Sequence, residues 1–406
     1  MSDVAPVMGA RAPGASRADR RKRTLAVVFA GFCAFLTLYA PQPLLPLLAS
    51  AFRVSANAAT RAISASTLAV VLAAPLVGML ADRFGRKRVI VWSALLLPIP
   101  TLLAATADGL NQLLLWRFWQ GIFTPGIFAV TVAYINEEWA DGAGSAMAAY
   151  VGGTVLGGFS GRMIAALVAA ETSWRWSFVV LGVLALLGAI GMWKWLPPES
   201  RAAQPRPARE MARAMLRHLR NPRLAATFAV GFCVLFTLLG AFTYVNFYLA
   251  APPFRLGTRA LGLVFTVYLA GAIFTPIAGR TIDRLGHRFA LTMGMAIAAS
   301  GLALTLAPHL AFVLAGLAMC CTGAWIAQSA ASTYIGTVAR EARAAAVGLY
   351  VMFYYLGGSF GSELPGHFWS RGGWPACVGL MVAVQLLAAA LGAVFWRPQP
   401  EAAAAP

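Results

Sequence analysis

The chain has 406 residues, of which 60% are hydrophobic and only 11% are charged, and its mean hydropathy is +0.72. Soluble domains carry about 25% charged residues, so this composition excludes a soluble globular protein, and recurring apolar runs of 18 or more residues indicate an all-α protein that crosses a membrane many times. The net charge of +18 lies mostly between those runs, so membrane topology explains it better than nucleic-acid binding does.

The N-terminal part begins with a segment, residues 1–23, that is rich in Ala, Pro, Gly and Arg and predicts a disordered basic tail at the cytoplasmic surface. The first apolar run is longer than a signal-peptide core and predicts a retained helix. Prolines at 41, 43 and 46 should bend or break that helix near its outer end. An N-terminal six-helix bundle is predicted over 24–195, with helices at about 25–49, 61–81, 89–106, 110–135, 143–168 and 175–195.

A polar, proline-containing segment at 196–222 predicts a cytoplasmic linker, and its basic stretch can form a short helix on the membrane surface. A second six-helix bundle is predicted over 223–396, before a cytoplasmic tail at 397–406, with helices at about 224–250, 260–280, 289–307, 311–336, 344–368 and 374–395. Twelve spans put both termini on one side. That side holds 24 of the 32 Lys and Arg residues and the opposite side holds six, which predicts cytoplasmic termini.

The two halves repeat each other at a shift of 200 or 201 residues. Residues 31–33, Gly-Phe-Cys, recur at 231–233, and Trp174 matches Trp374. The repeat predicts two pseudo-symmetric bundles formed by duplication, with a central site at their interface near mid-membrane.

A loop motif, G-x-x-x-D-R-x-G-x-[K/R], occurs once in each half, between two predicted helices. Its glycines at 85 and 286 allow the positive φ that closes a helix end. An aspartate near a helix C-terminus is disfavoured by about 0.3–1 kcal/mol, so a partner is expected, and two copies favour a structural latch over a solvated loop. The gate residues predicted from this motif are Gly78, Asp82, Arg83, Gly85 and Arg86, and Gly279, Asp283, Arg284 and Gly286.

The doubled motif resembles the loop signature of the major facilitator superfamily, and the resemblance covers roughly residues 25–395. It implies a transporter that works by alternating access between two bundles. It also implies that Asp82 faces the start of the eleventh helix and that Asp283 faces the start of the fifth, in contacts that break as the cytoplasmic side opens.

Arg117 lies inside the fourth predicted helix, where a cation costs at least about 2.5 kcal/mol unless it meets a cavity or a partner. The segment Arg117-x-x-Gln120-Gly121 resembles the family's R-x-x-Q-G motif, which implies a role for Arg117 and Gln120 in proton coupling. A structural arginine bonded to carbonyl groups is the alternative. The second half has Ala318 at the equivalent position, and this asymmetry favours function.

Three glycines of the fifth helix, Gly153, Gly157 and Gly161, are spaced by four and form one face that lets another helix approach closely. The helix resembles the family's antiporter signature but departs from it at Gly158 and Arg162, so simple close packing stays an alternative. Arg162 is expected near the outer end, with Glu171 as its possible partner.

Glu363 is the one carboxylate predicted inside an apolar span, where burial would let it exchange protons. Its expected partner is Arg61, because the family packs helices two and eleven together, and a static ion pair is the alternative. Glu137 and Glu138 end the fourth helix and can pair with Arg83, Arg86 or the basic linker as part of a gate.

Aromatic and polar side chains at helix positions near the expected central site predict a cavity for a neutral or amphipathic solute, and packing is the alternative for each. The candidates are Tyr39, Gln42, Tyr244, Asn246, Trp325, Gln328 and Tyr354. The five cysteines lie in apolar segments and the four histidines are scattered, which predicts no metal site and no cofactor. The absence of a nucleotide-binding or hydrolase motif argues against an enzyme and against transport driven by ATP.

The sequence thus favours a secondary active transporter of the bacterial inner membrane. It most resembles the arabinose-efflux-permease-like group of drug–proton antiporters, which implies proton-linked export of a small organic drug or metabolite by a monomer embedded in lipid. An uptake symporter or uniporter of the same fold and a transporter-like receptor or scaffold remain open.

Overall fold

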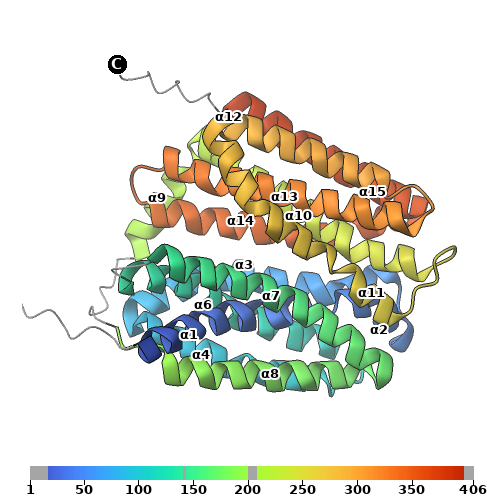
Figure 1. Ribbon diagram of the computed structural model, residues 1–406, viewed down its shortest axis with the longest axis horizontal. Helices are drawn as coiled ribbons and strands as arrows, with labels where there is room; N and C mark the ends of the chain where they lie inside the picture. The colour runs from blue at the N-terminus through green and yellow to red at the C-terminus, as the bar shows by residue number, and fades with distance from the viewer. Residues whose placement is uncertain (1–16, 140–142, 200–207, 397–406) are drawn as a thin grey trace, which may run out of the picture.

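The computed structural model describes residues 17–139, 143–199 and 208–396, without the side chains of 17–20, 208, 270–281 and 283. These residues form helices and no strand, and the helices gather into two bundles that lie side by side (Figure 1). The N-terminal bundle contains α1 (Arg17–Leu38), η1 (Gln42–Leu44), α2 (Leu45–Ala51), α3 (Ala56–Phe84), α4 (Arg86–Leu96), α5 (Pro98–Ala104), α6 (Leu110–Glu138), α7 (Ala143–Glu171) and α8 (Trp174–Trp195).

The second bundle follows a surface helix, α9 (Ala208–Leu219), and repeats the pattern of the first. It contains α10 (Pro222–Ala250), α11 (Thr258–Val264), α12 (Val267–Leu304), α13 (Leu310–Val338), α14 (Arg343–Glu363) and α15 (Pro365–Phe395). Ten helical segments of the described chain are long and apolar enough to cross a membrane. The predicted spans at 260–280 and 289–307 fall on α11 and α12, so the predicted fold of twelve spans in two six-helix bundles is confirmed.

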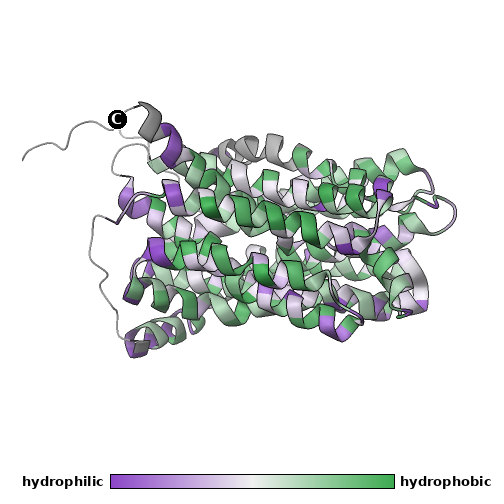
Figure 2. Cartoon of the chain, turned by 90° about the horizontal axis from the view of Figure 1, so that it is seen from below, coloured by the Kyte–Doolittle hydropathy of each residue, from purple (hydrophilic) through white to green (hydrophobic). Residues whose placement is uncertain are grey.

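Hydrophobic residues cover the middle of the molecule and hydrophilic ones gather toward its two ends (Figure 2). Large apolar side chains such as Leu76, Leu187 and Val394 are 59%, 59% and 74% exposed, which a lipid environment accepts and water does not. We call the end that holds α9 and the α3–α4 turn the linker side, and the end that holds α2 and α11 the far side (Figure 1).

Proline and glycine positions explain where the helices break. Pro41 cannot donate a hydrogen bond, so α1 ends at Leu38 and a short 3₁₀ turn, η1, follows. Gly85 separates α3 from α4 at a φ of 93°, and Gly286 breaks α12 at a φ of 82°, as the loop motif predicts. The turn at Gly372 and Gly373 divides α15, so the eleventh span continues past the end of α14 before the chain reverses.

The glycine face of α7 lies directly against the backbone of α1. A Cβ atom added at Gly153, Gly157 or Gly161 would collide with the carbonyl oxygens of α1 residues, and in the second bundle Gly357 lies in the same way against the backbone of Phe232 on α10. Small residues therefore allow one close helix pair at the same place in each bundle, and the duplicated sequence produces duplicated packing.

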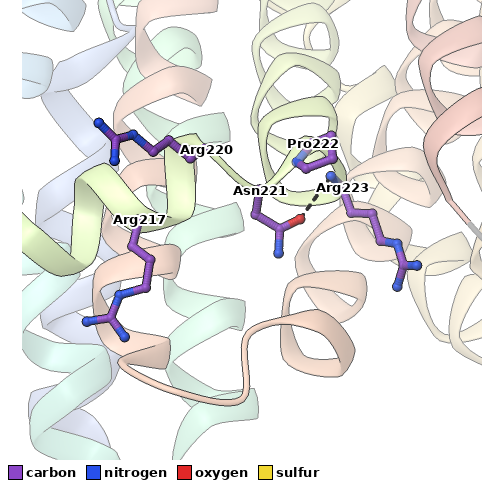
Figure 3. Close-up of a pocket in the computed structure, with 5 residues that line it drawn as sticks. All are labelled: Arg217, Arg220, Asn221, Pro222 and Arg223. Carbon is purple, nitrogen blue, oxygen red and sulfur yellow. Dashed lines mark hydrogen bonds between the residues drawn. The ribbon is translucent and has the colours of Figure 1, made fainter.

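The linker helix α9 is attached to the second bundle. Arg217 forms an ion pair with Glu341 at 2.9 Å, and His218 Nε2 lies 3.3 Å from the carbonyl oxygen of Ala342, just before α14 begins. Beyond α9, Asn221 caps α10 by accepting a hydrogen bond from the backbone N–H of Arg223. Arginines line the concave surface at this corner, namely Arg217, Arg220 and Arg223 (Figure 3).

Candidate functional site

The two bundles meet along a seam, which we define as the contacts of α3 with α10 and α14, of α7 with α11 and α12, and of η1 with α10 and α11. The hydroxyl oxygens of Thr67 on α3 and Ser359 on α14 lie 2.8 Å apart, at about mid-depth because the span of α14 continues into the first part of α15. Nearer the far side, the Thr60 hydroxyl lies 3.3 Å from that of Tyr244, and Gln42 Nε2 donates to Thr243 Oγ1 at 3.2 Å. Each of these pairs joins residues about 185 to 290 positions apart, so the seam is a purely tertiary feature.

Two ion pairs close the far-side rim of the seam. Arg61 pairs with Glu363 at 3.3 Å, as predicted, and Arg259 pairs with Glu171. The second pair corrects an expectation, because Glu171 was the partner predicted for Arg162. Glu171 ends α7 near the start of α11, so it meets Arg259 across the seam, whereas Arg162 lies more than two turns deeper.

Glu363 is also not buried, contrary to the prediction of a carboxylate inside an apolar span. It is the last residue of α14, and its side chain is 42% exposed. An exposed pair of this kind contributes only about 0–1 kcal/mol. The environment therefore favours the static ion pair over the proton carrier.

We accordingly expect Glu363→Gln to leave proton-gradient-driven flux within about twofold of the wild-type rate, because a rim pair in contact with water adds little. Initial rates in proteoliposomes with an imposed pH gradient measure this. Arg61→Gln is the matched control on the other partner. A complete loss of gradient-driven flux in Glu363→Gln alone would restore the proton-carrier hypothesis.

On the linker side, the side chains of the loop motif bond within their own bundle. Arg86 lies 3.9 Å from Asp82 and 2.5 Å from Glu137, so α3, α4 and α6 are tied together. Glu199, at the end of the first bundle, accepts the backbone N–H of Lys87 at 2.5 Å and so caps α4, a role that the sequence did not indicate.

The predicted contact of Asp82 with the start of the eleventh helix is absent among the described residues. A Cβ atom added at Gly78, one turn before Asp82, would meet no atom within 4 Å. The hydrogen bonds and ion pairs found between described side chains of the two bundles lie from mid-depth to the far side. Among the described residues, no hydrogen bond or ion pair joins the linker-side ends of α3 and α14. In the second copy of the motif, Arg284 is exposed. Gly279 and the side chain of Asp283 lie outside the described side chains, so the contact predicted for Asp283 stays a prediction.

Arg117 is fully buried and bonded to carbonyl and polar groups of its own bundle. Its Nε donates to the carbonyl of Ala62 at 2.8 Å and its Nη1 to the carbonyl of Thr37 at 2.9 Å. Nη2 donates to Ser66 Oγ at 2.7 Å, and two shorter contacts reach the carbonyl of Leu38 and Gln120 Oε1. The guanidinium thus connects α1, α3 and α6, the arrangement expected of a structural arginine. Its role in proton coupling stays a prediction.

A second buried arginine, Arg162 on α7, faces the seam and is only 3% exposed. Its Nε donates to Gln42 Oε1 at 2.7 Å, and its Nη1 donates to the carbonyl of Gly158 at 2.7 Å. Gln42 in turn bonds Thr243, so a polar chain runs from one bundle to the other. We did not predict Arg162 as a site residue, although a charge inside an apolar run is the same signal that singled out Arg117.

Aromatic rings from both bundles meet beside this polar chain. Phe128 lies between Phe35 and Tyr355 in tilted ring contacts with centroid distances of 5.9 and 5.5 Å, and Tyr355 is perpendicular to Tyr354 at 5.7 Å. Of the predicted cavity residues, Tyr39 and Tyr354 belong to this cluster. Phe128 was missed because an aromatic residue in an apolar helix carries no sequence signal of its own.

The other predicted cavity residues differ in their surroundings. Gln328 accepts a hydrogen bond from Tyr350 at 2.6 Å, and Trp325 donates to Cys321 Sγ at 3.2 Å, so both are held within the second bundle. Tyr244 is fully buried in the far-side seam. Asn246 donates to the carbonyl of Phe242 at 2.6 Å, and its side-chain oxygen has no partner among the described residues. The described residues contain no cluster that could hold a metal ion.

Proteins of known family resemble this chain in sequence and in structure. The sequence pattern of the Major Facilitator Superfamily matches residues 27–259 and 241–406. The inner membrane transport protein YnfM of Escherichia coli is 33% identical over 372 residues, covering 91% of this chain and 88% of that protein. The nucleoside transporter NupG has a similar structure, with a TM-score of 0.76 at 16% identity, covering 93% of this chain and all of that one. A partial match, 32% identical over 43% of this chain and 42% of that protein, is the chloramphenicol resistance protein CraA of Acinetobacter baumannii.

Proposed function

Because the chain belongs to the major facilitator superfamily, we propose that this membrane transporter exports a small organic solute by alternating access. The observation that carries the proposal is the one-sided seam. The bonds found between described residues of the two bundles lie from mid-depth to the far side, while a Cβ atom added at Gly78 on the linker side would meet no atom within 4 Å. This arrangement fits one end state of a pair of bundles that rock about a central site, open toward the linker side.

The linker side is the cytoplasmic side in this proposal, and the membrane is the bacterial inner membrane. Support comes from the excess of Lys and Arg on that side and from the likeness to YnfM, whose name places it in the inner membrane. In this proposal, the side on which the bundles are not bonded faces the cytoplasm, where an exporter loads its solute. The partial likeness to CraA, named for chloramphenicol resistance, supports export over uptake.

The proton gradient is the proposed energy source. The segment from Arg117 to Gly121 resembles the proton-coupling motif of antiporters in this superfamily, and the chain carries no nucleotide-binding motif. The predicted partners are a small-molecule substrate, the proton and the bilayer, and the predicted functional unit is the monomer.

The proposal is tested by comparing accumulation of a panel of dyes and antibiotics in cells with and without the chain. We expect lower accumulation of at least one compound when the chain is present, and a protonophore should remove the difference. Higher accumulation would indicate uptake. Unchanged accumulation of every compound, with the protein present in the membrane, would favour the receptor or scaffold reading.

A reversible cross-link provides the control for alternating access. Thr67→Cys combined with Ser359→Cys puts two thiols across the seam where the hydroxyls are now 2.8 Å apart. We expect oxidation to stop transport in the double variant and reductant to restore it, while Thr67→Cys alone is unaffected. Full transport in the cross-linked protein would contradict the rocking of the bundles.

A further inference from the structure

Arg162 is a cation in the membrane interior for which the described residues provide no carboxylate. Glu171 pairs with Arg259, and the other Asp and Glu residues with described side chains lie at helix ends, in connections or on α9. A buried charge is costly unless it is paired or meets a solvent-filled or ligand-filled space. The negative complement of Arg162 is thus missing from the described part of the protein.

The contrast with Arg117 shows how incomplete the surroundings of Arg162 are. A guanidinium carries five N–H donors. Arg117 makes five hydrogen bonds to described residues, whereas Arg162 makes two, to Gln42 and Gly158. Arg162 therefore keeps guanidinium donors that no described residue uses.

Aromatic rings from both bundles surround that guanidinium. Its Cζ lies 5.0 Å from the ring centre of Tyr39, 5.0 Å from that of Phe265 and 4.7 Å from that of Tyr268. The hydroxyl of Tyr268 is buried and has no hydrogen-bond partner among the described residues. A cation and an unused hydroxyl donor thus lie next to each other where the two bundles meet.

This charge belongs to one half of the duplicated chain only. The position that corresponds to Arg162 in the second half is Ser362, whose hydroxyl bonds the carbonyl of Gly358 at 3.0 Å, just as Arg162 Nη1 bonds that of Gly158. In α14 a serine at this position is compatible with the same close helix packing, so the packing of α7 does not require a guanidinium.

We propose that the transported solute is an organic anion with an apolar or aromatic body, whose carboxylate binds Arg162 and the hydroxyl of Tyr268. This inference rests on the proposed function and specifies its substrate class. The planar guanidinium fork matches a carboxylate, and the neighbouring cluster of Phe35, Phe128 and Tyr355 offers ring faces to the body of the solute. The anion neutralises Arg162 only while it is bound, and both bundles contribute to its site.

The test measures thermal stabilisation of the purified full chain by paired probes. Benzoate, phenylacetate, 3-phenylpropionate and 1-naphthoate are each compared with the corresponding neutral amide. We expect at least one acid to raise the melting temperature at concentrations about tenfold or more below those that its amide requires, because hydrogen bonds to charged groups are the stronger ones.

Variants assign the effect to the site. Arg162→Gln should weaken stabilisation by that acid about 100-fold, and Tyr268→Phe, which removes a single hydroxyl, should weaken it about tenfold. Arg371→Gln removes an exposed far-side arginine and should change nothing. If Arg162→Gln does not fold, Tyr268→Phe and Arg162→Lys carry the test, and both should bind the acid more weakly than the wild type.

The proposal is overturned if no acid stabilises the protein, if acid and amide act equally, or if the Arg162 and Tyr268 variants bind the acid as well as the wild type does. Because stabilisation requires no transport, this result is independent of the direction of flux. Acid binding without any change in cellular accumulation would contradict the export proposal and leave the anion site standing.

Discussion

Replacing Arg117 by alanine is expected to lower transport at least about 100-fold and to lower the melting temperature of the purified protein. The effect should be large because the Arg117 side chain donates hydrogen bonds to the last carbonyl groups of α1, which the break at Pro41 leaves without a backbone donor. Pro41 has no N–H to offer the carbonyl of Thr37, and the backbone N–H of Gln42 bonds Tyr39 instead of Leu38. Arg117 donates to both of these carbonyls.

The guanidinium also brings positive charge to the C-terminal end of α1, where the helix dipole favours it. Without it, at least two carbonyls lose their donor in an apolar interior, at about 1–3 kcal/mol each. The turn that follows, η1, holds Gln42, which bonds both Arg162 and Thr243. Losing Arg117 should therefore disturb the seam as well as the bundle.

Two flux measurements separate this positioning role from proton coupling. Uptake into proteoliposomes driven by a pH gradient tests coupling, and exchange of solute without a gradient tests the transport cycle alone. We expect Arg117→Ala to lose both, and Arg117→Lys to be intermediate because an ammonium cannot reproduce the forked contacts. Loss of gradient-driven flux with normal exchange would indicate a coupling role only. Normal flux in both assays would remove Arg117 from the mechanism.

Gly157→Leu is expected to abolish accumulation of folded protein. A Cβ atom at this position would collide with the carbonyl oxygen and other backbone atoms of Phe32 on α1. Overpacking costs about 1–3 kcal/mol when side chains can move, and more is expected here because a helix backbone is the obstacle. The loss should appear as little or no monodisperse protein after extraction in detergent.

Gly152→Leu is the matched control on the same helix. Gly152 is exposed, and an added Cβ atom would meet no atom within 4 Å. It should yield folded protein at the wild-type level and transport normally. Equal yields for the two leucine variants would show that the close approach of α1 and α7 is not required.

Much of the fold could be predicted because its causes are local. The apolar runs gave the spans, Pro41 gave the break after α1, and Gly85 and Gly286 gave the turns with positive φ. The pair of Arg61 and Glu363 could be predicted through the family resemblance, which supplied the neighbouring helices. The exposure of this pair could not be predicted, because the depth at which α14 ends depends on how the helices pack.

The candidate site was harder to predict because lipid-facing and protein-facing sides of a membrane helix are both apolar, so hydrophobic periodicity does not identify the seam. Arg117 and Arg162 have the same sequence signal, a cation in an apolar run. One meets the end of a broken helix and the other meets aromatic rings of the opposite bundle. That distinction arises only when residues more than 50 positions apart come together.

The sequence by itself determined a duplicated chain of membrane-spanning helices, its turns and the distribution of its charges, since each follows from hydrogen bonding and hydration along a short stretch. Only the tertiary structure decided which charges are paired, which side of the seam is closed and which buried cation keeps free donors in the described chain. These properties depend on distances between helices, because a charge in an apolar medium is stabilised only by the groups that packing brings within a few ångströms of it.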